Sequence, residues 1–479
     1  MIQVSDTLRR EVVPLETRDP GRAGIYTCGL TVYNYAHVGN MRSIIWFDFI
    51  RAYLAYRGYN VTFVMNYTDV DDKIIERAKV EGIPPEAVTA KYTKAFEDDL
   101  LALGGRMPDV TPRATGHIED MIGAIQGLVD KGFAYESEGN VWFAVEKFDS
   151  YGKLSHRSLD DMRAGERIEP HPSKHNPLDF SLWKAAKEGE PAWDSPWGPG
   201  RPGWHIECSV MSEKYLGMGF DIHGGGSDLI FPHHENEIAQ AEALFGAEPL
   251  ARYWLHSGMV QMDAEKMSKS LGNVALARDV LERYPGEAVR YWMLQSTYRS
   301  QVVFSEKSLN DASQSYERWR NFKEAAAHAL GDEMPASPEP LLRPLDDDSL
   351  PTGYVQTFIN ALDDDFSSAE AFAAIHELVG EANKRVDGAQ RGDAETRAEL
   401  IELTRTFLEL TGVLGMKFPS VDSGSEIVGA LVEAMLELRE RARARKDFEE
   451  ADAIRDKFVE LGIVIEDTPA GARWRIGVS

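Results

Sequence analysis

The chain has only two cysteines, and their surroundings suggest a metal site. Cys208 comes shortly before the run Phe231-Pro-His-His-Glu-Asn-Glu237, whereas Cys28 lies far from both in the sequence. On a helix, His233 and Glu237 would be about one turn apart and project from the same face. Zn²⁺ accepts sulfur, nitrogen and oxygen ligands in a tetrahedral site, so these four side chains are candidate ligands. The alternative is that both cysteines are small buried hydrophobes, because they form no compact Cys-x-x-Cys motif.

A second group of residues is suited to a nucleotide. The loop 266–270 carries two lysines between small residues, and lysines so placed can follow the charge that develops when a phosphate is displaced. His37-Val-Gly-Asn40 lies between a predicted strand and a predicted helix, where a helix N-terminus attracts phosphate. The turn 223–228 can present a carboxylate to a ribose hydroxyl. The candidate nucleotide-binding residues are His37, Gly39, Asn40, Asp228, Lys266, Ser268 and Lys269.

Each of these nucleotide features has a plain structural alternative. The histidine can be a helix cap, the lysine loop an ordinary surface turn, and the glycine-rich segment a tight turn. The chain contains no G-x-x-x-x-G-K-[ST] run, so P-loop chemistry is not supported.

Alternating strands and helices must position these side chains. Residues 24–28 and 60–65 read as strands, residues 40–57 have helical spacing, and a helical pattern starts again near Asp72. Strand–helix alternation predicts a parallel sheet with right-handed crossovers. Ligands of such sheets bind at the carboxyl ends of the strands, which is where Cys28 would lie.

The α/β pattern stops and then resumes. Within 134–203, segments such as 140–145 alternate like antiparallel strands, and the α/β pattern returns with strands at 220–223 and 253–258 around a helix at 232–245. Amphipathic helices dominate from about residue 305. The predicted fold class is α/β: a Rossmann-type parallel-sheet catalytic domain with an inserted α+β subdomain, followed by an α-helical bundle and a small C-terminal mixed α/β module.

Six segments follow from this pattern. They are a first half of the Rossmann domain (1–133), a connective insertion (134–203), a second half (204–260), a segment with the lysine loop (261–304), a helical bundle (305–417) and a C-terminal module (426–479). The proline-rich stretch 331–353 reads as a linker or long connection, and 418–425 as a break before the last module.

Composition limits the class of function. The formal net charge of -26 argues against a protein that coats nucleic acid without selectivity. The run 439–446 is locally basic, and it is either a solvated helix face or a nucleic-acid contact. No apolar run approaches the ~20 residues of a membrane span, so we expect no membrane partner. Two cysteines and a first segment unlike a signal peptide lead us to expect a cytoplasmic location.

Taken together, these residues resemble the cysteinyl-tRNA synthetase family within the class I aminoacyl-tRNA synthetases. His37-Val-Gly-Asn40 resembles the family's HIGH signature, and Lys266-Met-Ser-Lys-Ser270 matches its KMSKS signature letter for letter. Asn40 replaces the final histidine of HIGH, which weakens a catalytic role for that residue. The most specific similarity lies in the runs Cys28–Tyr33, Trp204–Cys208, Phe220–Asp228 and Phe231–Glu237.

The resemblance extends over essentially the whole chain and implies particular roles. The bundle after residue 305 is similar to an anticodon-binding bundle, and residues 426–479 to an anticodon-recognition module. One zinc ion per chain would be held by Cys28, Cys208, His233 and Glu237, with Mg²⁺ accompanying ATP. The implied catalytic residues are His37, Lys266 and Lys269; the implied L-cysteine pocket is Gly29, Thr31, Thr68, Trp204 and His223; the implied tRNA contacts are Arg439, Arg443 and Trp474.

The implied reaction is acyl transfer in two steps by a monomer. Cysteine attacks the α-phosphate of ATP to give cysteinyl-adenylate and pyrophosphate, and a ribose hydroxyl at the 3′ end of tRNA(Cys) then takes the acyl group. A thiol of pKa ~8.5 ionises readily on zinc, whereas a serine hydroxyl gains far less, so we expect zinc to select the substrate thiolate. Pocket shape alone would separate such near-isosteres by only ~10–200-fold.

Two rival functions remain open. A cysteine ligase of the mycothiol pathway resembles the same catalytic half, but its amino-sugar acceptor requires no anticodon reader. The region 420–479 therefore favours tRNA. A non-catalytic tRNA-binding regulator is the other rival, and the intact signature lysines and the complete ligand set argue against it.

Overall fold

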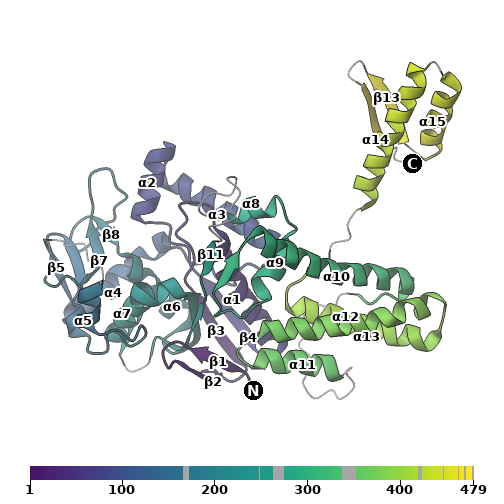
Figure 1. The fold of residues 1–479 in the computed structure, drawn as a ribbon. Coiled ribbons are helices and arrows are strands. Elements are labelled where there is room, and N and C mark those ends of the chain that lie inside the picture. The colour runs from purple at the N-terminus through teal and green to yellow at the C-terminus, as the bar shows by residue number, and fades with distance from the viewer. Residues whose placement is uncertain are drawn as a thin grey trace. The chain divides into compact units, whose positions relative to one another are not determined.

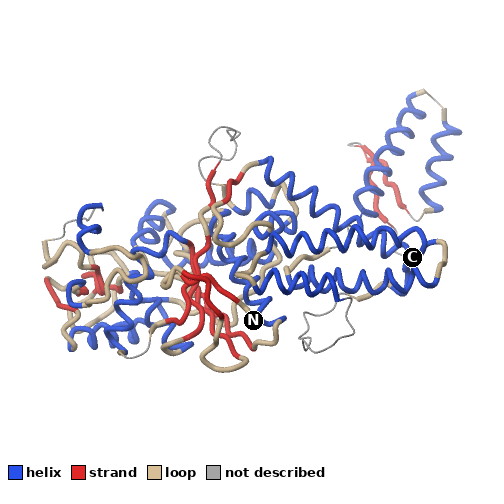
Figure 2. The backbone as a smooth tube through the Cα atoms, turned by 60° about the horizontal axis from the view of Figure 1, so that its bottom comes forward, coloured by secondary structure: helices blue, strands red, loops and turns tan. Residues whose placement is uncertain are grey.

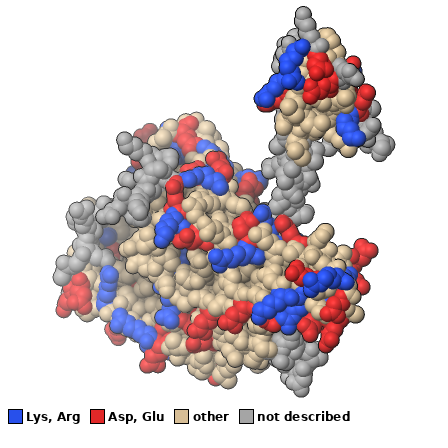
Figure 3. Space-filling view, turned by 45° about the vertical axis from the view of Figure 1, so that its right-hand side comes forward, with Lys and Arg blue, Asp and Glu red and all other residues tan. Residues whose placement is uncertain are grey.

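The computed structural model describes residues 1–165, 172–246, 249–262, 275–336, 352–418, 423–445, 447–461, 463–468 and 471–476. The chain divides into two compact units, Met1–Lys417 and Phe418–Ser479. In the described residues, no helix combines the length and the apolar character that crossing a membrane requires. Lys and Arg side chains are interspersed with Asp and Glu over the visible face of each unit (Figure 3).

A four-stranded parallel sheet forms the centre of the first unit (Figures 1 and 2). Its strands run in the order β10-β9-β3-β4, and all neighbours are parallel. The strand bounds are β3 Arg22–Thr27, β4 Asn60–Met65, β9 Phe220–Gly226 and β10 Ala251–Ser257. This arrangement confirms the predicted α/β class with a Rossmann-type sheet.

Helices cover both faces of this sheet (Figure 1). Helix α1 (Val38–Tyr56) packs on one face, and α6 (Trp204–Leu216) packs on the other beside α7 (Glu235–Phe245). Gly224 lets α1 lie close to β9, because a Cβ at this position would come within 2.2 Å of the ring of Phe47. The sheet is therefore doubly wound, with its core on both sides.

The helix predicted over 232–245 differs in its first turn. Residues 230–234 form a π-helical turn, labelled η4 (Ile230–His234), and α7 itself begins at Glu235. The backbone of Phe231 is extended, with φ of -138° and ψ of 132°, so a regular α-helix cannot pass through it. His233 thus lies on the π turn and Glu237 on the first turn of α7.

The insertion forms an antiparallel sheet in the order β5-β6-β7-β8. Its strands are β5 Ala134–Ser137, β6 Asn140–Phe143, β7 Phe180–Ala185 and β8 Gly200–Pro202, with α4 Ile118–Asp130, η2 Val145–Lys147 and α5 Leu159–Gly165. Buried aromatic side chains of this sheet, such as Phe143 and Trp183, share a core with α4 and α6. The insertion is therefore packed directly against the helix that carries Cys208.

Shorter elements complete the catalytic half. Their bounds are β1 Gln3–Asp6, β2 Glu11–Pro14, α2 Asp72–Glu81, α3 Pro85–Ala102, η1 Ala114–His117, η3 Ser227–Leu229, β11 Val260–Met262, α8 Ala277–Leu281, α9 Gly286–Leu294 and β12 Val302–Phe304. Strand β11 pairs in parallel with β12.

A helical bundle closes the first unit. Its bounds are α10 Glu306–Leu330, η5 Gly331–Glu333, α11 Thr352–Asp363, α12 Ser368–Gln390 and α13 Ala394–Val413, and the long helices pack alongside one another (Figure 2). Most of the predicted connection 331–353 lies outside the described residues.

Arg290 ties the bundle to the sheet. This side chain is 0% exposed on α9, where it donates to the carbonyl of Leu414 at 2.7 Å and to Asp48 Oδ2 on α1 at 3.0 Å. Gly415 adopts φ of +68°, and a Cβ there would lie 2.5 Å from the guanidinium. The end of α13 is thereby fixed against the catalytic half.

The second unit has a small core of its own. Helices α14 (Ser423–Ala444) and α15 (Phe448–Glu460) pack together, and β13 (Ile463–Thr468) and β14 (Gly471–Ile476) form an antiparallel hairpin. Val432, Leu436, Phe458 and Ile463 are buried between them.

Candidate active site

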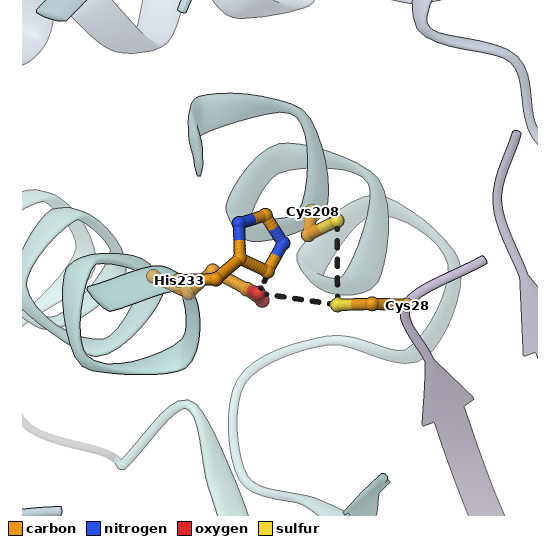
Figure 4. A group of neighbouring side chains, drawn as sticks. Cys28, Cys208 and His233 are labelled. Atoms are coloured by element: carbon orange, nitrogen blue, oxygen red, sulfur yellow. Dashed lines mark hydrogen bonds and ion pairs between the residues drawn. The ribbon is translucent and has the colours of Figure 1, made fainter. Parts of the chain in front are cut away.

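Four side chains from distant parts of the chain converge at the carboxyl end of β3 (Figure 4). Cys28 directly follows β3, and Cys208 projects from α6. Cys28 Sγ lies 3.6 Å from Cys208 Sγ and 3.2 Å from Glu237 Oε1. His233 Nε2 lies 3.0 Å from the same oxygen. One potential ligand atom from each of the four residues lies within 4.8 Å of all the others.

This cluster fits a tetrahedral metal ion. Zinc bond lengths place neighbouring ligand atoms ~3.4–3.8 Å apart, close to the separations found here. Cys208, His233 and Glu237 are at most 1% exposed, so a bound ion would be shielded from solvent. Two sulfurs, one nitrogen and one oxygen are a donor set that suits zinc.

Burial changes the ionisation of both thiols. It raises the pKa of Cys208 to about 11, and it raises the pKa of Cys28 well above its ordinary range. Without a cation, both thiols therefore stay protonated at neutral pH. A divalent ion reverses this preference, because a coordinating thiol is deprotonated outright.

A second set of possible ligands shares two members with the first. Cys28 and Glu237 also lie within 4.8 Å of ligand atoms of His223 and His234. Cys28 and His233 both approach Glu237 Oε1, however, whereas His223 Nε2 contacts the other oxygen, Oε2, at 2.8 Å. His233 thus shares one oxygen of Glu237 with Cys28, whereas His223, which is 0% exposed, contacts the other.

The predicted substrate pocket adjoins this cluster. Gly29 N donates to Asn66 Oδ1 at 2.9 Å, and the backbones of Thr31 and Thr68 form a parallel bridge. The ring of Trp204 stacks on that of His233 at 4.2 Å and stays 38% exposed. Four of the five predicted pocket residues thus line the ends of β3 and β4 or the start of α6, while His223 is buried behind the cluster.

Three buried polar residues beside the predicted pocket were not predicted from the sequence. Asn66 Oδ1 lies 3.7 Å from Cys208 Sγ, Glu207 accepts from the hydroxyl of Thr68, and the buried hydroxyl of Tyr26 neighbours both thiols. Desolvation raises the pKa values of Tyr26 and Glu207 well above their ordinary ranges. Glu207 directly precedes Cys208, and Tyr26 lies two residues before Cys28. This proximity in the sequence could have indicated that both residues belong to the site.

His37 caps helix α1. Its Nδ1 accepts from Asn40 N at 3.1 Å, and Asn40 Oδ1 accepts from His37 N at 3.4 Å, so both residues form a capping box. A Cβ on Gly39 would lie 3.1 Å from the imidazole ring. Burial lowers the pKa of His37 while the carboxylate of Asp228 opposes that shift, so these two predicted nucleotide-binding residues act on each other.

The segment that follows the lysine loop in the sequence lies next to this helix start. Lys266, Ser268 and Lys269 lie outside the described residues, but the segment that follows them is visible. Val38 N donates to the carbonyl of Ala275 at 3.0 Å, and Ala277 N donates to the carbonyl of Ala36 at 2.9 Å. Residues 275–277 therefore lie directly against the N-terminus of α1.

In the second unit, the arginines of the basic run face different ways. Arg439 is 4% exposed, whereas the side chains of Arg441, Arg443 and Arg445 are 72%, 45% and 66% exposed. The exposed three present the positive charge of the run, although each also pairs with a glutamate. Nothing is described of the side chain of Trp474.

Comparison with protein families gives three matches along the chain. Residues 14–314 match the catalytic domain of class I (C) tRNA synthetases, 357–419 match the DALR domain, and 428–475 match the cysteinyl-tRNA ligase anticodon binding domain. A cysteine–tRNA ligase of Heliobacterium modesticaldum is 46% identical over 479 residues, with 99% of both chains covered. One of Brevibacillus brevis is 47% identical over 474 residues, again with 99% of both covered.

Solved structures share the fold at low sequence identity. A Mycobacterium tuberculosis methionyl-tRNA synthetase bound by methionyl-adenylate superimposes with a TM-score of 0.60 at 15% identity, covering 82% of this chain and 90% of that one. An Agrobacterium radiobacter leucyl-tRNA synthetase in a ternary complex gives 0.55 at 11% identity, covering 84% and 86%.

Proposed function

The chain belongs to the cysteine–tRNA ligase family of class I aminoacyl-tRNA synthetases, and on that premise we propose that it charges tRNA(Cys) with L-cysteine. ATP would activate the amino acid as cysteinyl-adenylate, releasing pyrophosphate, and the 3′ end of the tRNA would accept the cysteinyl group. The observation that carries the proposal is the convergence of Cys28, Cys208, His233 and Glu237 beside the predicted amino-acid pocket.

The four convergent side chains would hold one zinc ion. Bound zinc supplies a Lewis acid that ionises the substrate thiol and distinguishes it from the hydroxyl of serine. These residues would hold the ion beside the predicted amino-acid pocket, where it would meet the substrate thiol. Trp204 stacks on His233 and remains partly exposed, so its indole forms a wall where the amino acid would enter.

Phosphate chemistry would take place at the start of α1. His37 sits at the helix N-terminus, which attracts negative charge, and Lys266 and Lys269 would follow the charge that develops on the α-phosphate. Mg²⁺ would neutralise the departing pyrophosphate. Since little covalent work falls to the protein, positioning and charge stabilisation would supply most of the rate.

The second unit would read the tRNA anticodon. Exposed arginines of α14 offer cations for phosphate contacts, and the match of residues 428–475 to an anticodon binding domain supports this use. We expect the chain to act as a monomer.

Aminoacylation with labelled L-cysteine and transcribed tRNA(Cys) tests the proposal. The expected result is charging that depends on cysteine, ATP and the tRNA, together with one zinc per chain by elemental analysis. Cysteine-dependent ATP–pyrophosphate exchange without tRNA charging would instead favour a ligase with a small amino-sugar acceptor. Binding of tRNA with neither activity would favour a regulator.

A further inference from the structure

Glu207 on α6 carries a buried carboxyl group that is only half satisfied. The residue is 0% exposed, and its Oε2 accepts a hydrogen bond of 2.7 Å from the hydroxyl of Thr68. Its other oxygen, Oε1, is buried and has no hydrogen-bond partner in the part of the chain that the structure describes. A buried polar atom without a partner is costly and calls for an explanation.

The surroundings of Glu207 are acidic. Asp69, Asp71 and Glu237 are the charged neighbours that act on it most strongly. A buried acid that also faces other acids lacks the partner that charge burial normally requires. Such a position suits a cationic ligand, which would satisfy the free oxygen and relieve the repulsion.

Thr68 connects this acid to the predicted substrate pocket. It follows β4, and its backbone pairs with Thr31 after β3. The nearby side chain of Asn66 lies 3.7 Å from Cys208 Sγ, so this loop adjoins the metal cluster. In L-cysteine only the α and β carbons separate the ammonium group from the sulfur. A thiol bound at the cluster therefore brings the ammonium group into this neighbourhood.

Hydrogen-bond chemistry fixes the direction of the Thr68 hydroxyl. A cation bound beside Glu207 favours its ionised form, whose oxygens only accept, so the single hydroxyl proton of Thr68 then points to Glu207. The lone pairs of that oxygen are then free to accept from another donor. An ammonium group has three N–H donors and no acceptor, which makes it complementary.

Resting on the proposed function, we propose that Glu207 is a positioning residue for the substrate ammonium group. It holds the Thr68 hydroxyl as an acceptor for the ammonium and supplies the buried negative charge beside it. Recognition of the amino acid then has two separate parts, with the thiol read at the metal cluster and the ammonium read by the Thr68–Glu207 pair.

A purely structural role is the alternative. In that case the Thr68–Glu207 bond is a latch that holds the loop after β4 against α6. A substitution that removes this hydrogen bond would then weaken the binding of every ligand in the pocket equally. Loss of a specific ammonium site would weaken the binding only of ligands that carry an ammonium group.

The test compares L-cysteine with 3-mercaptopropionate, which keeps the thiol and carboxylate but lacks the ammonium group. In Glu207→Gln we expect the KM for cysteine in ATP–pyrophosphate exchange to rise ~10–100-fold, the loss typical of a charged hydrogen bond. The inhibition constant of 3-mercaptopropionate should change by less than ~3-fold, within the effect of an ordinary surface substitution. Zinc content and the KM for ATP should be unchanged.

Glu235→Gln is the matched control. Glu235 is also 0% exposed, but its oxygens accept from the backbone N–H groups of Gly152, Leu154 and Ser155. This variant should leave the ratio of the two affinities unchanged. If Glu207→Gln does not fold, Glu207→Asp is the substitute, because it withdraws the carboxylate from Thr68 by one methylene. It should likewise raise the KM for cysteine while leaving the inhibition constant of 3-mercaptopropionate nearly unchanged.

A double-mutant cycle tests whether Glu207 acts through Thr68. Thr68→Val should lose the preference for cysteine over 3-mercaptopropionate, and adding Glu207→Gln should change it no further. Equal weakening of both ligands in Glu207→Gln, or no weakening of either, overturns the inference. If the wild-type chain shows no cysteine-dependent exchange at all, the proposed function itself has failed.

Discussion

The sulfur atoms of Cys28 and Cys208 lie 3.6 Å apart, which is the separation of two thiolates on one tetrahedral zinc ion. Both are free cysteines, one directly after a strand and the other on a helix that packs on a face of the same sheet. Two segments of the chain, one before and one after the insertion, each contribute one sulfur. The cluster of four potential ligands therefore forms only when both segments have folded together.

Cys208→Ser tests this relationship. A serine hydroxyl is a poor zinc ligand, so we expect the variant to lose its zinc, measured by elemental analysis. Selectivity for cysteine over serine in ATP–pyrophosphate exchange should then fall to the ~10–200-fold that pocket shape alone provides. Ser212→Ala, one turn further along α6 and also buried, should keep both zinc and selectivity. A zinc-free Cys208→Ser protein with undiminished selectivity would show that the metal does not read the thiol.

Arg290→Met tests the joint between the bundle and the catalytic half. Removing the guanidinium leaves the buried Asp48 carboxylate without its fully buried partner, which costs about 3–5 kcal/mol. Urea denaturation should report this as a loss of unfolding free energy. Arg106 also pairs with Asp48, but its side chain is 40% exposed, so Arg106→Met should cost only about 1 kcal/mol. Equal losses in the two variants would mean that Arg290 has no special part in the joint.

Asp99 gives the stability of the protein a defined pH dependence. Desolvation on α3 raises its pKa from 3.8 to about 6, because its Oδ2 is buried without a hydrogen-bond partner among the described residues. The folded state thus binds this proton more tightly than the unfolded chain does. The contribution to unfolding free energy is complete below pH ~4 and is lost as the pH rises through about 6.

Asp99→Asn should remove this dependence. Between pH 4 and 7 the unfolding free energy of the wild-type protein should fall relative to that of the variant by about 2–3 kcal/mol. Denaturation at several pH values measures the difference, and the neighbouring Asp98→Asn, with its side chain 50% exposed before substitution, is the control. Parallel pH curves for wild type and Asp99→Asn would contradict the assignment.

The parts of the site that follow from strand order and local spacing were predictable from sequence. Cys28 had to lie at a carboxyl strand end once residues 24–28 were read as a strand of a parallel sheet. His233 and Glu237 meet because a spacing of four residues survives the π turn. The sequence runs around these residues resemble one enzyme family, so they specified the function more closely than the amino-acid composition did.

The polar partners were not predictable, because they depend on three-dimensional register. Thr68 and Glu207 are 139 residues apart, and nothing in either segment specifies that their side chains meet. The arginines of the basic run alternate with other residues, so its sequence left open which of them the core would cover. The structure buries Arg439 and exposes Arg443 because the packing of α14 against α15 sets the helix phase.

Electronic absorption of the cobalt-substituted protein tests the central claim most directly. Co²⁺ takes the same ligand types as zinc and reports each thiolate through a sulfur-to-metal charge-transfer band. L-cysteine and L-serine are titrated in turn, while calorimetry measures binding independently. We predict that the charge-transfer absorption grows on saturation with L-cysteine and stays constant with L-serine. Saturable cysteine binding that leaves the cobalt spectrum unchanged would contradict direct recognition of the thiolate by the metal.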